Sequence, residues 1–324
     1  MRYRYLVMPL SELAGLAATL DEHGRSAVAD AVAARWGVPA GTAQFHRSSA
    51  SHVFKVAVDD DTAYLKFVPA TLRPQRELAA IANLMQRLSQ RGPGVAAPLS
   101  SVDGQLLEAV ETPRGHVHAM LISEAPGESI DPRDLSRAQA ENWGAALARL
   151  HRDSEELVSD DLPTGFADLT HAETTLSADE PLTEAVARLR ASLERVPRDG
   201  AIHGDFELDN LAWLGNTPTA FDFDDAARSW YVADIASALR DPASPVAEFL
   251  AGYRSVRQLT DADLAHVPLF TAAQAACWLI RLPTIVDRDP SPDDPPWLTT
   301  LRTKLYEHGR RQRSIVLEAS PPRQ

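Results

Sequence analysis

The stretch from residue 201 to residue 226 constrains this 324-residue chain more than any other. It reads AIHGDFELDNLAWLGNTPTAFDFDDA. Two apolar segments, residues 211–214 and 219–223, flank a Gly-Asn-Thr-Pro turn, a pattern typical of a β-hairpin. Such a hairpin would bring Asp205, Asn210 and Asp222 to one rim. There, one aspartate can accept a proton from a hydroxyl, while an amide oxygen and a second carboxylate can bind a hard cation such as Mg²⁺.

His-Gly-Asp, an asparagine five residues after the aspartate, and a later Phe-Asp-Phe-Asp strand together resemble the aminoglycoside phosphotransferase family. That family is related to choline, fructosamine and homoserine kinases and, more distantly, to protein kinases. The resemblance implies that Asp205 is the catalytic base and that Asn210 and Asp222 bind magnesium. These groups belong together in a kinase because phosphoryl transfer depends mostly on positioning and charge neutralisation.

The resemblance covers roughly residues 42–240 and also implies a fold. We expect an α+β, bilobal protein-kinase-like structure with a small antiparallel-sheet N-lobe carrying one helix and a larger, mainly helical C-lobe. The expected divisions are a nucleotide-binding lobe with a helical extension at residues 1–122, a connector at 123–127, and a catalytic and substrate lobe at 128–324. Residues 1–40 have the composition of one or two helices.

Lys66 lies in the middle of an apolar strand, in the run YLKF. Alternation places Lys66 and Val68 on one face and Leu65 and Phe67 on the other. A lysine in such a strand needs a partner or a route to water. In the family that the sequence resembles, the phosphate-binding lysine occupies this strand. The alternative is an edge-strand lysine that reaches solvent.

Glu77 is the expected partner of Lys66. It shares one helical face with Ile81, Leu84 and Leu88, at spacings of four, seven and eleven residues. A carboxylate on an apolar face requires a cation, so we predict an ion pair with Lys66 that orients the lysine for nucleotide binding. The alternative is a first-turn acid favoured by the helix dipole.

Two further segments are expected to contact the nucleotide. Ser49 and Ser51 lie in a small-residue turn that would cover the phosphates, although many relatives have glycine there. Ser123 and Ala125 lie in the segment that resembles the family's connector between the lobes. Their backbone groups would meet the edge of the nucleotide base.

Composition excludes several classes of protein. The net charge of −13 argues against nucleic-acid binding; it would steer a cationic substrate or simply keep the protein soluble. The single cysteine, Cys277, excludes a disulfide framework and reads as a core residue. No segment is long and apolar enough for a membrane span or a signal peptide. We therefore expect a cytoplasmic protein without membrane partners.

The predicted function is Mg²⁺-dependent transfer of the γ-phosphate of ATP or GTP to a hydroxyl of a small molecule, an antibiotic among the candidates. Glu207 and Asp209 would face a cationic acceptor or else be solvated loop charges. The alternatives are a bacterial Ser/Thr protein kinase, a metabolic alcohol or sugar kinase, and a nucleotide-binding pseudokinase regulator. An acidic pocket roofed by residues 286–297 would favour a small molecule, and an open groove would favour a protein. The sequence leaves the acceptor and the oligomeric state open.

Overall fold

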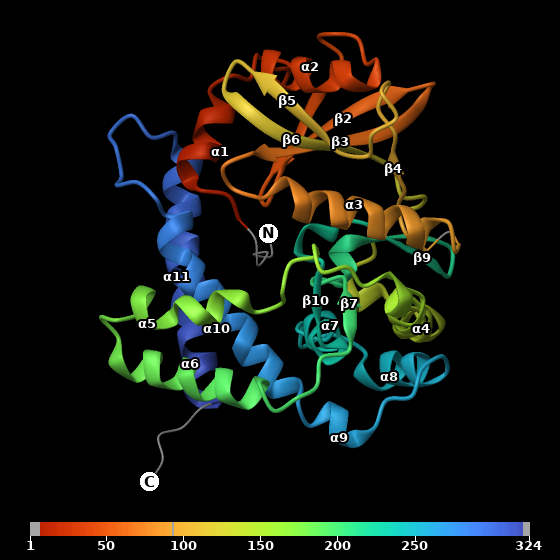
Figure 1. The fold of residues 1–324 in the computed structure, drawn as a ribbon, viewed down its shortest axis with the longest axis vertical. Helices are drawn as coiled ribbons and strands as arrows, with labels where there is room; N and C mark the ends of the chain where they lie inside the picture. The colour runs from red at the N-terminus through yellow and green to blue at the C-terminus, as the bar shows by residue number, and fades with distance from the viewer. Residues whose placement is uncertain (1–6, 93, 320–324) are drawn as a thin grey trace.

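A computed structural model describes residues 7–92 and 94–319. A six-stranded antiparallel sheet lies at one end of the molecule, and helices form most of the other end (Figure 1). The two-lobed α+β fold expected from the resemblance is confirmed. The exact division at residues 123–127 stays a prediction. Residues 1–6, 93 and 320–324 of the expected lobes lie outside the described residues.

The sheet has strand order β1-β2-β3-β6-β4, and β5 pairs with β6. Its strands are β1 (Gln44–Ser48), β2 (His52–Val58), β3 (Asp61–Pro69), β4 (Pro98–Leu99), β5 (Glu108–Thr112) and β6 (Gly115–Ser123). Strand β3 follows the predicted alternation. Leu65 and Phe67 pack in one hydrophobic cluster, whereas Val68 packs in the other. The sheet therefore separates two cores, and Lys66 is on the side that faces the large lobe.

Three helices flank the sheet: α1 (Leu10–Ala17), α2 (Ala27–Ala33) and α3 (Gln75–Ser89). The helices expected in residues 1–40 are thus present as α1 and α2. Helix α2 begins after Ser26, whose hydroxyl accepts the N–H of Val28 at 3.1 Å. Helix α3 lies between the sheet and the large lobe (Figure 1), and its Ile81, Leu84 and Leu88 belong to the larger core.

The large lobe contains eight of the described helices: α4 (Arg137–Ser154), α5 (Ala172–Thr175), α6 (Glu180–Leu193), α7 (Tyr231–Ala238), α8 (Val246–Arg254), α9 (Asp261–Leu264), α10 (Val267–Ile285) and α11 (Pro296–Ala319). Two short hairpin-like sheets pair β7 (Gly200–Ile202) with β10 (Ala227–Ser229), and β8 (Leu211–Leu214) with β9 (Thr217–Ala220). Ser136 and Gln139 form the expected capping box at the start of α4.

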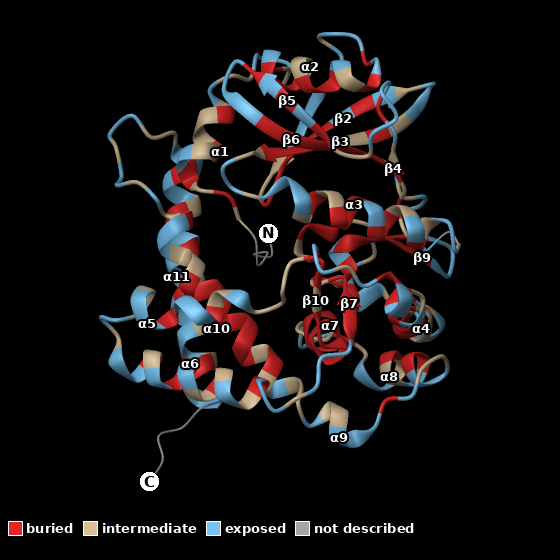
Figure 2. Cartoon of the chain, viewed as in Figure 1, coloured by how far each residue is buried: buried red, intermediate tan, exposed pale blue. Residues whose placement is uncertain are grey.

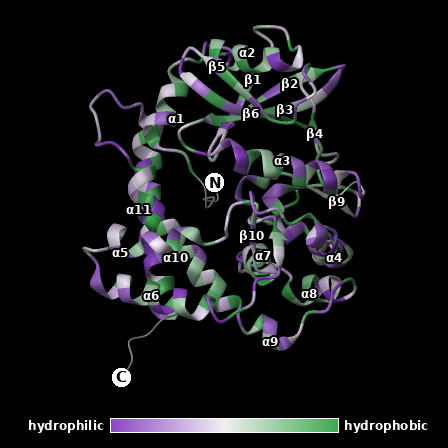
Figure 3. Cartoon of the chain, in the orientation of Figure 1, coloured by the Kyte–Doolittle hydropathy of each residue, from purple (hydrophilic) through white to green (hydrophobic). Residues whose placement is uncertain are grey.

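Helix α7 is buried along its whole length and lies at the centre of the large lobe (Figure 2). Hydropathy follows burial, with hydrophilic residues gathered on the outer helices and loops (Figure 3). The strand expected to continue to residue 223 ends at Ala220, and Phe223–Asp225 form a 3₁₀ helix. Because α7 follows β10 directly, the residues after this Phe-Asp-Phe-Asp segment return beside the His-Gly-Asp loop. This placement determines the geometry of the site.

Helices α4 and α8 meet through two glycines. A Cβ on Gly144 would lie 1.8 Å from the Phe249 carbonyl oxygen, and a Cβ on Gly252 would lie 1.7 Å from that of Glu141. Neither distance is compatible with a side chain, so the two backbones touch directly. The contact fixes α8 against α4.

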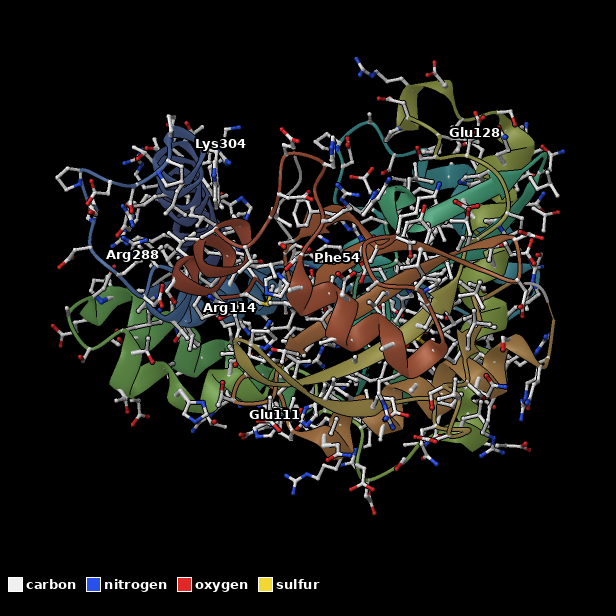
Figure 4. The ribbon with its side chains drawn as sticks, turned by 90° about the horizontal axis from the view of Figure 1, so that it is seen from above. Phe54, Glu111, Arg114, Glu128, Arg288 and Lys304 are labelled. Carbon is white, nitrogen blue, oxygen red and sulfur yellow. The ribbon has the colours of Figure 1, made fainter. Side chains whose placement is uncertain are left out.

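Hydrogen bonds hold the connector and the first helix against the large lobe. Glu128, just beyond the expected connector, exchanges two backbone hydrogen bonds with Trp213 of β8, at 3.1 and 2.8 Å. On the other side of the molecule, the carboxylate of Asp287 accepts the backbone N–H of Ser11 in α1 at 3.0 Å. Viewed from above, Glu128 and Lys304 of α11 lie on opposite sides (Figure 4). None of the helices within the described ranges has the length and apolar character to cross a membrane.

Candidate active site

The His-Gly-Asp loop follows β7 and is held by Asp234 of α7. Asp234 accepts the backbone N–H groups of His203 at 2.8 Å and Gly204 at 2.7 Å. Its Oδ2 atom also lies 3.0 Å from Nε2 of the buried His151 on α4. Gly204 has a φ of +87°, and a Cβ there would lie 2.1 Å from the carbonyl oxygen of Asp225. Only glycine fits this turn.

His203 supports the loop in its neutral form. Its Nε2 atom lies 3.1 Å from the Phe221 carbonyl oxygen, so this nitrogen carries the proton and donates. The other ring nitrogen then accepts the N–H of Asp205 at 3.2 Å. Burial lowers the pKa of His203 and outweighs the neighbouring carboxylates. His203 is therefore a structural hydrogen bonder that connects the loop to the Phe-Asp-Phe-Asp segment.

Asp205, the expected base, is buried and held on both carboxylate oxygens. Its Oδ2 atom accepts from Nδ2 of Asn210 at 2.9 Å, and its Oδ1 atom accepts from Arg240 at 2.9 Å and from Ser237 at 3.4 Å. Nδ2 of Asn210 also donates to the Asp205 carbonyl at 2.8 Å. The amide nitrogen of Asn210 thus faces Asp205. The amide oxygen of Asn210, the atom that could bind a metal, therefore points away from Asp205.

Asp222 meets the small lobe through two cations. Lys66 Nζ lies 2.6 Å from Asp222 Oδ1, and Arg47 Nη2 of β1 lies 2.7 Å from Asp222 Oδ2. Asp222 itself has a left-handed backbone, with φ 68° and ψ 60°. A non-glycine residue in this region is strained, and such strain concentrates at functional sites.

Lys66 also binds Asp224, at 2.9 Å, and Ser51 donates its hydroxyl to the other oxygen of Asp224 at 2.9 Å. Burial acts to raise the pKa of Asp224, but Lys66 and Arg73 hold it well below its usual value. The ammonium group of Lys66 is therefore bound between the carboxylates of Asp222 and Asp224. Among the described residues, no group of three or more His, Cys, Asp or Glu side chains is arranged around a metal position.

The predicted ion pair between Lys66 and Glu77 is wrong. The structure pairs Lys66 with Asp222 and Asp224 instead. Glu77 is half-buried in the first turn of α3 and lines a different cavity from the one beside Arg47. The helix-dipole alternative for Glu77 fits this position better.

A cavity of about 310 Å³ lies between the lobes and is lined by Lys66, Asp222 and Arg47. Ser123 and Ala125 line the same cavity, as expected for the connector. The Ser123 N–H already donates to the Ala97 carbonyl at 2.9 Å. Nucleotide contacts by these two residues stay a prediction.

The turn that contains Ser49 and Ser51 makes hydrogen bonds within the protein, whereas it was expected to face the phosphates of the nucleotide. Ser51 is buried against Asp224, and the Ser49 carbonyl accepts the N–H of Met8 at 2.8 Å. Neither serine lines the 310 Å³ cavity. Their predicted phosphate contacts would require the turn to change its hydrogen bonds.

A second cavity, of about 250 Å³, lies on the other side of the Phe-Asp-Phe-Asp segment. It is lined by Gly204 and by four carboxylates and two arginines: Glu77, Asp168, Asp224, Asp225, Arg73 and Arg281. Burial raises the pKa of Asp225 to about 7, and the nearby guanidinium of Arg281 only partly opposes this. The cavity is acidic, but residues 286–297 do not line it, so the expected roof is absent from this part of the described chain. The buried Cys277 also lines it, and burial raises the pKa of its thiol to about 12.

Two arginines at the site were not anticipated from the sequence. Arg47 binds Asp222, and Arg240 binds both Asp205 and Glu207. Glu207 is therefore neutralised by Arg240, and it does not line the acidic cavity as an acceptor ligand would. Asp209 lines the 310 Å³ cavity. The spacing of Asp234, Ser237 and Arg240 by three residues along the chain is a weak signal for Arg240, because α7 ends at Ala238.

Comparisons with known proteins agree with this geometry. The model of the phosphotransferase enzyme family, APH, matches residues 42–266. An amicoumacin kinase from Bacillus subtilis is 25% identical over 275 residues, which cover 76% of this chain and 81% of that protein. A homoserine kinase from a Janthinobacterium species is 27% identical over 214 residues, or 62% of this chain and 64% of that protein.

The solved structure of the amicoumacin kinase hAmiN in complex with AMP-PNP, Ca²⁺ and Ami has the same fold, with a TM-score of 0.75 and 20% identity over 95% of this chain and 97% of that one. The fold and the constellation of Lys66, Asp205 and Asp222 define a phosphotransferase with a protein-kinase-like architecture. The family match covers well over half of the sequence. The chain belongs to the phosphotransferase enzyme family, and its named relatives are kinases of small molecules.

Proposed function

We propose that this protein transfers the γ-phosphate of ATP or GTP, bound with Mg²⁺, to a hydroxyl of a small molecule that carries a cationic amine. One observation carries the proposal: Lys66, Asp222 and Asp224 form a charged cluster between a 310 Å³ cavity and a 250 Å³ acidic cavity. The first cavity would take the nucleotide and the second the acceptor. The amicoumacin, homoserine and AMP-PNP named for the relatives support this division.

Each residue then has a role in the transfer. Asp222 and the amide oxygen of Asn210 would hold the metal, which neutralises phosphate charge when bound. When nucleotide binds, Lys66 and Arg47 would release the Asp222 carboxylate and bind phosphate oxygens instead. Asp205 orients the acceptor hydroxyl and takes its proton as the new O–P bond forms and the bond to the leaving nucleotide diphosphate breaks.

The acceptor class follows from the second cavity. Its four carboxylates outnumber its two arginines, and Arg281 is already bound by Asp168 at 2.6 Å. An ammonium group fits this imbalance better than an anion. Antibiotics that contain amino groups are therefore among the first compounds to test, and so are amino alcohols and hydroxy amino acids. A cytoplasmic setting, suggested by the single buried cysteine, completes the proposal.

A coupled assay of ADP or GDP release across a panel of such compounds tests the function. The expected result is acceptor-dependent release that falls by about 10²–10⁴-fold in Asp205→Asn, because the proton acceptor is lost. The matched control variant Asp289→Asn removes an exposed carboxylate that lines neither cavity. Release that is independent of every acceptor, or that is equal in wild type and Asp205→Asn, would contradict the proposal.

A further inference from the structure

A third cavity, of about 320 Å³, lies behind the catalytic loop and shares one lining residue, Leu211, with the 310 Å³ cavity. Its apolar lining includes Phe206 and Leu211, which follow Asp205 and Asn210 directly in the sequence, and Ala220, two residues before Asp222. All three are almost fully buried. The cavity therefore borders the three segments that carry the catalytic groups, without including those groups.

Three arginines line the same cavity. Arg149 and Arg152 lie on α4, and Arg91 follows the end of α3. Ala146, Arg149, Leu150 and Asp153 lie at spacings of three, four and seven residues, so this face of α4 carries both apolar and charged groups. All three arginines are exposed, and one carboxylate, that of Asp153, lines the cavity beside them.

The charges of these arginines are unequally compensated. Arg152 Nε lies 2.8 Å from Asp153, and Arg91 Nη2 lies 3.5 Å from the exposed Glu156. Arg149 makes no side-chain hydrogen bond or ion pair with any residue within the described ranges. Partial burial and the adjacent Arg152 lower the pKa of Arg149, while Asp153 acts in the opposite direction. Its side chain is exposed, so the guanidinium group can meet an anion at the mouth of the cavity.

The cavity is also mechanically linked to the site. The segment after α3 forms a short parallel pairing with β9, in which the Ala220 N–H donates to Gly94 and the Ala96 N–H donates to the Ala220 carbonyl, both at 2.9 Å. Helix α3, β9 and α4 meet at this corner of the molecule (Figure 1). A ligand here would contact the segment after α3, which pairs with β9, and β9 itself, which leads to Asp222.

We propose that this cavity is a regulatory site for a small organic anion, with an apolar body against Phe206 and Leu211 and an acidic head group bound by Arg149 and its neighbouring arginines. A carboxylate, sulfonate or phosphate head can present two oxygens to the planar guanidinium group, which donates two parallel hydrogen bonds to them. Binding would change the affinity of the active site for nucleotide through β9. The inference goes beyond the proposed function, and its binding step does not depend on that function.

Isothermal titration calorimetry with naphthalene-2-sulfonate tests the binding step on the full chain. Naphthalene-2-sulfonamide is the uncharged control ligand. We expect one site whose affinity falls about tenfold or more in Arg149→Ala and also in Ala146→Leu, which fills the apolar part. Arg310→Ala, an exposed arginine of α11 on the opposite side of the molecule, should bind as wild type does. Saturation with AMP-PNP and Mg²⁺ should leave the anion bound.

A fluorescent ADP analogue then measures coupling. Its dissociation constant should change by about fivefold or more when wild type is saturated with the sulfonate, and should stay constant in Arg149→Ala. Unchanged sulfonate affinity in Arg149→Ala, equal binding of the sulfonamide, or displacement of the sulfonate by AMP-PNP would overturn the site. Sulfonate binding that leaves nucleotide affinity unchanged would overturn its regulatory role. None of these readouts requires turnover, so a failure of the proposed kinase reaction is recognised separately.

Discussion

Arg240 Nη2 lies 2.9 Å from Oδ1 of Asp205 and at the same distance from the hydroxyl of Ser237. One helix therefore organises both parts of the catalytic loop. Asp234 near the start of α7 binds the backbone of His203 and Gly204, while Ser237 and Arg240 near its end bind the carboxylate of Asp205. The base is oriented by α7 as much as by its own loop.

We expect Arg240→Met to lower kcat by about 10–10² fold, because a base displaced by about 1 Å loses the geometry needed for proton transfer. The affinity for nucleotide should change little, since Arg240 does not line the nucleotide cavity. Arg240→Lys keeps the charge and should recover part of kcat, and added guanidinium should partly rescue Arg240→Ala. Equal kcat in Arg240→Met and wild type would show that the contact has no positioning role.

Lys66 provides a test of the cation site that does not depend on activity. Lys66→Met leaves Asp222 and Asp224 with less compensating charge in a buried position, and removing one partner of a buried ion pair typically costs about 3–5 kcal/mol. Millimolar Mg²⁺ should therefore raise the Tm of this variant more than that of wild type. Lys55→Met on β2, half-exposed and 3.8 Å from Glu124, is the matched control. A Tm of Lys66→Met that does not respond to Mg²⁺ would argue against the metal site.

Asp225 predicts a pH-dependent stability. Its pKa is raised from 3.8 to about 7 in the folded protein, so between these values the native state binds more protons than the unfolded state. Stability then falls as pH rises through this window, and the loss is complete above about pH 7. Each pKa unit corresponds to about 1.4 kcal/mol.

Urea denaturation of Asp225→Asn and wild type at pH 5, 6, 7 and 8 measures this effect. The variant should gain stability relative to wild type as pH increases, because it lacks the unfavourable ionisation. In turnover, KM of wild type for an amine-bearing acceptor should decrease through about pH 7 as Asp225 becomes negative. A pH-independent difference between the two proteins would exclude the raised pKa.

Asp234→Asn should separate loop geometry from chemistry. The amide keeps one acceptor oxygen in place of two, so at least one of the three hydrogen bonds that converge on the carboxylate is lost, and an unsatisfied buried donor costs about 1–3 kcal/mol. We expect a lower Tm and a loss of kcat together, with Ser237→Ala affecting kcat but much less the Tm. Hydrogen exchange at His203 and Gly204 should increase in Asp234→Asn only. Unchanged hydrogen exchange at these two residues would show that Asp234 does not hold the backbone of the loop.

The motif located Asp205, Asn210 and Asp222, and the strand pattern with the resemblance located Lys66. The structure pairs Asp205 with Asn210, and Lys66 reaches Asp222 from β3 of the small lobe. The same reasoning failed for Glu77. Helical periodicity gives the face of α3 but not the distance between α3 and the sheet, and that distance lets Asp222 and Asp224 reach Lys66 first. The left-handed backbone of Asp222 also leaves no trace in residue type.

The arginines illustrate a second limit. Arg47 reaches Asp222 from a strand 175 positions earlier in the chain, so only the closure of the lobes brings the two together. Arg240 lies only six residues after an aspartate already expected to support the loop. However, α7 ends at Ala238, so helical spacing does not place the Arg240 side chain.

The geometry of the catalytic loop also depends on the glycine contact between α4 and α8, which lies away from the two active-site cavities. Tyr253 of α8 bonds to Nδ1 of His151 at 2.8 Å, and His151 in turn bonds to Asp234. A single methyl group at Gly144 or Gly252 would push α8 outward and pull Tyr253 and His151 away from Asp234. Substitutions at these two positions should therefore abolish phosphate transfer without changing any residue that lines the cleft. A screen for inactivating mutations should find both positions, although neither contacts a ligand.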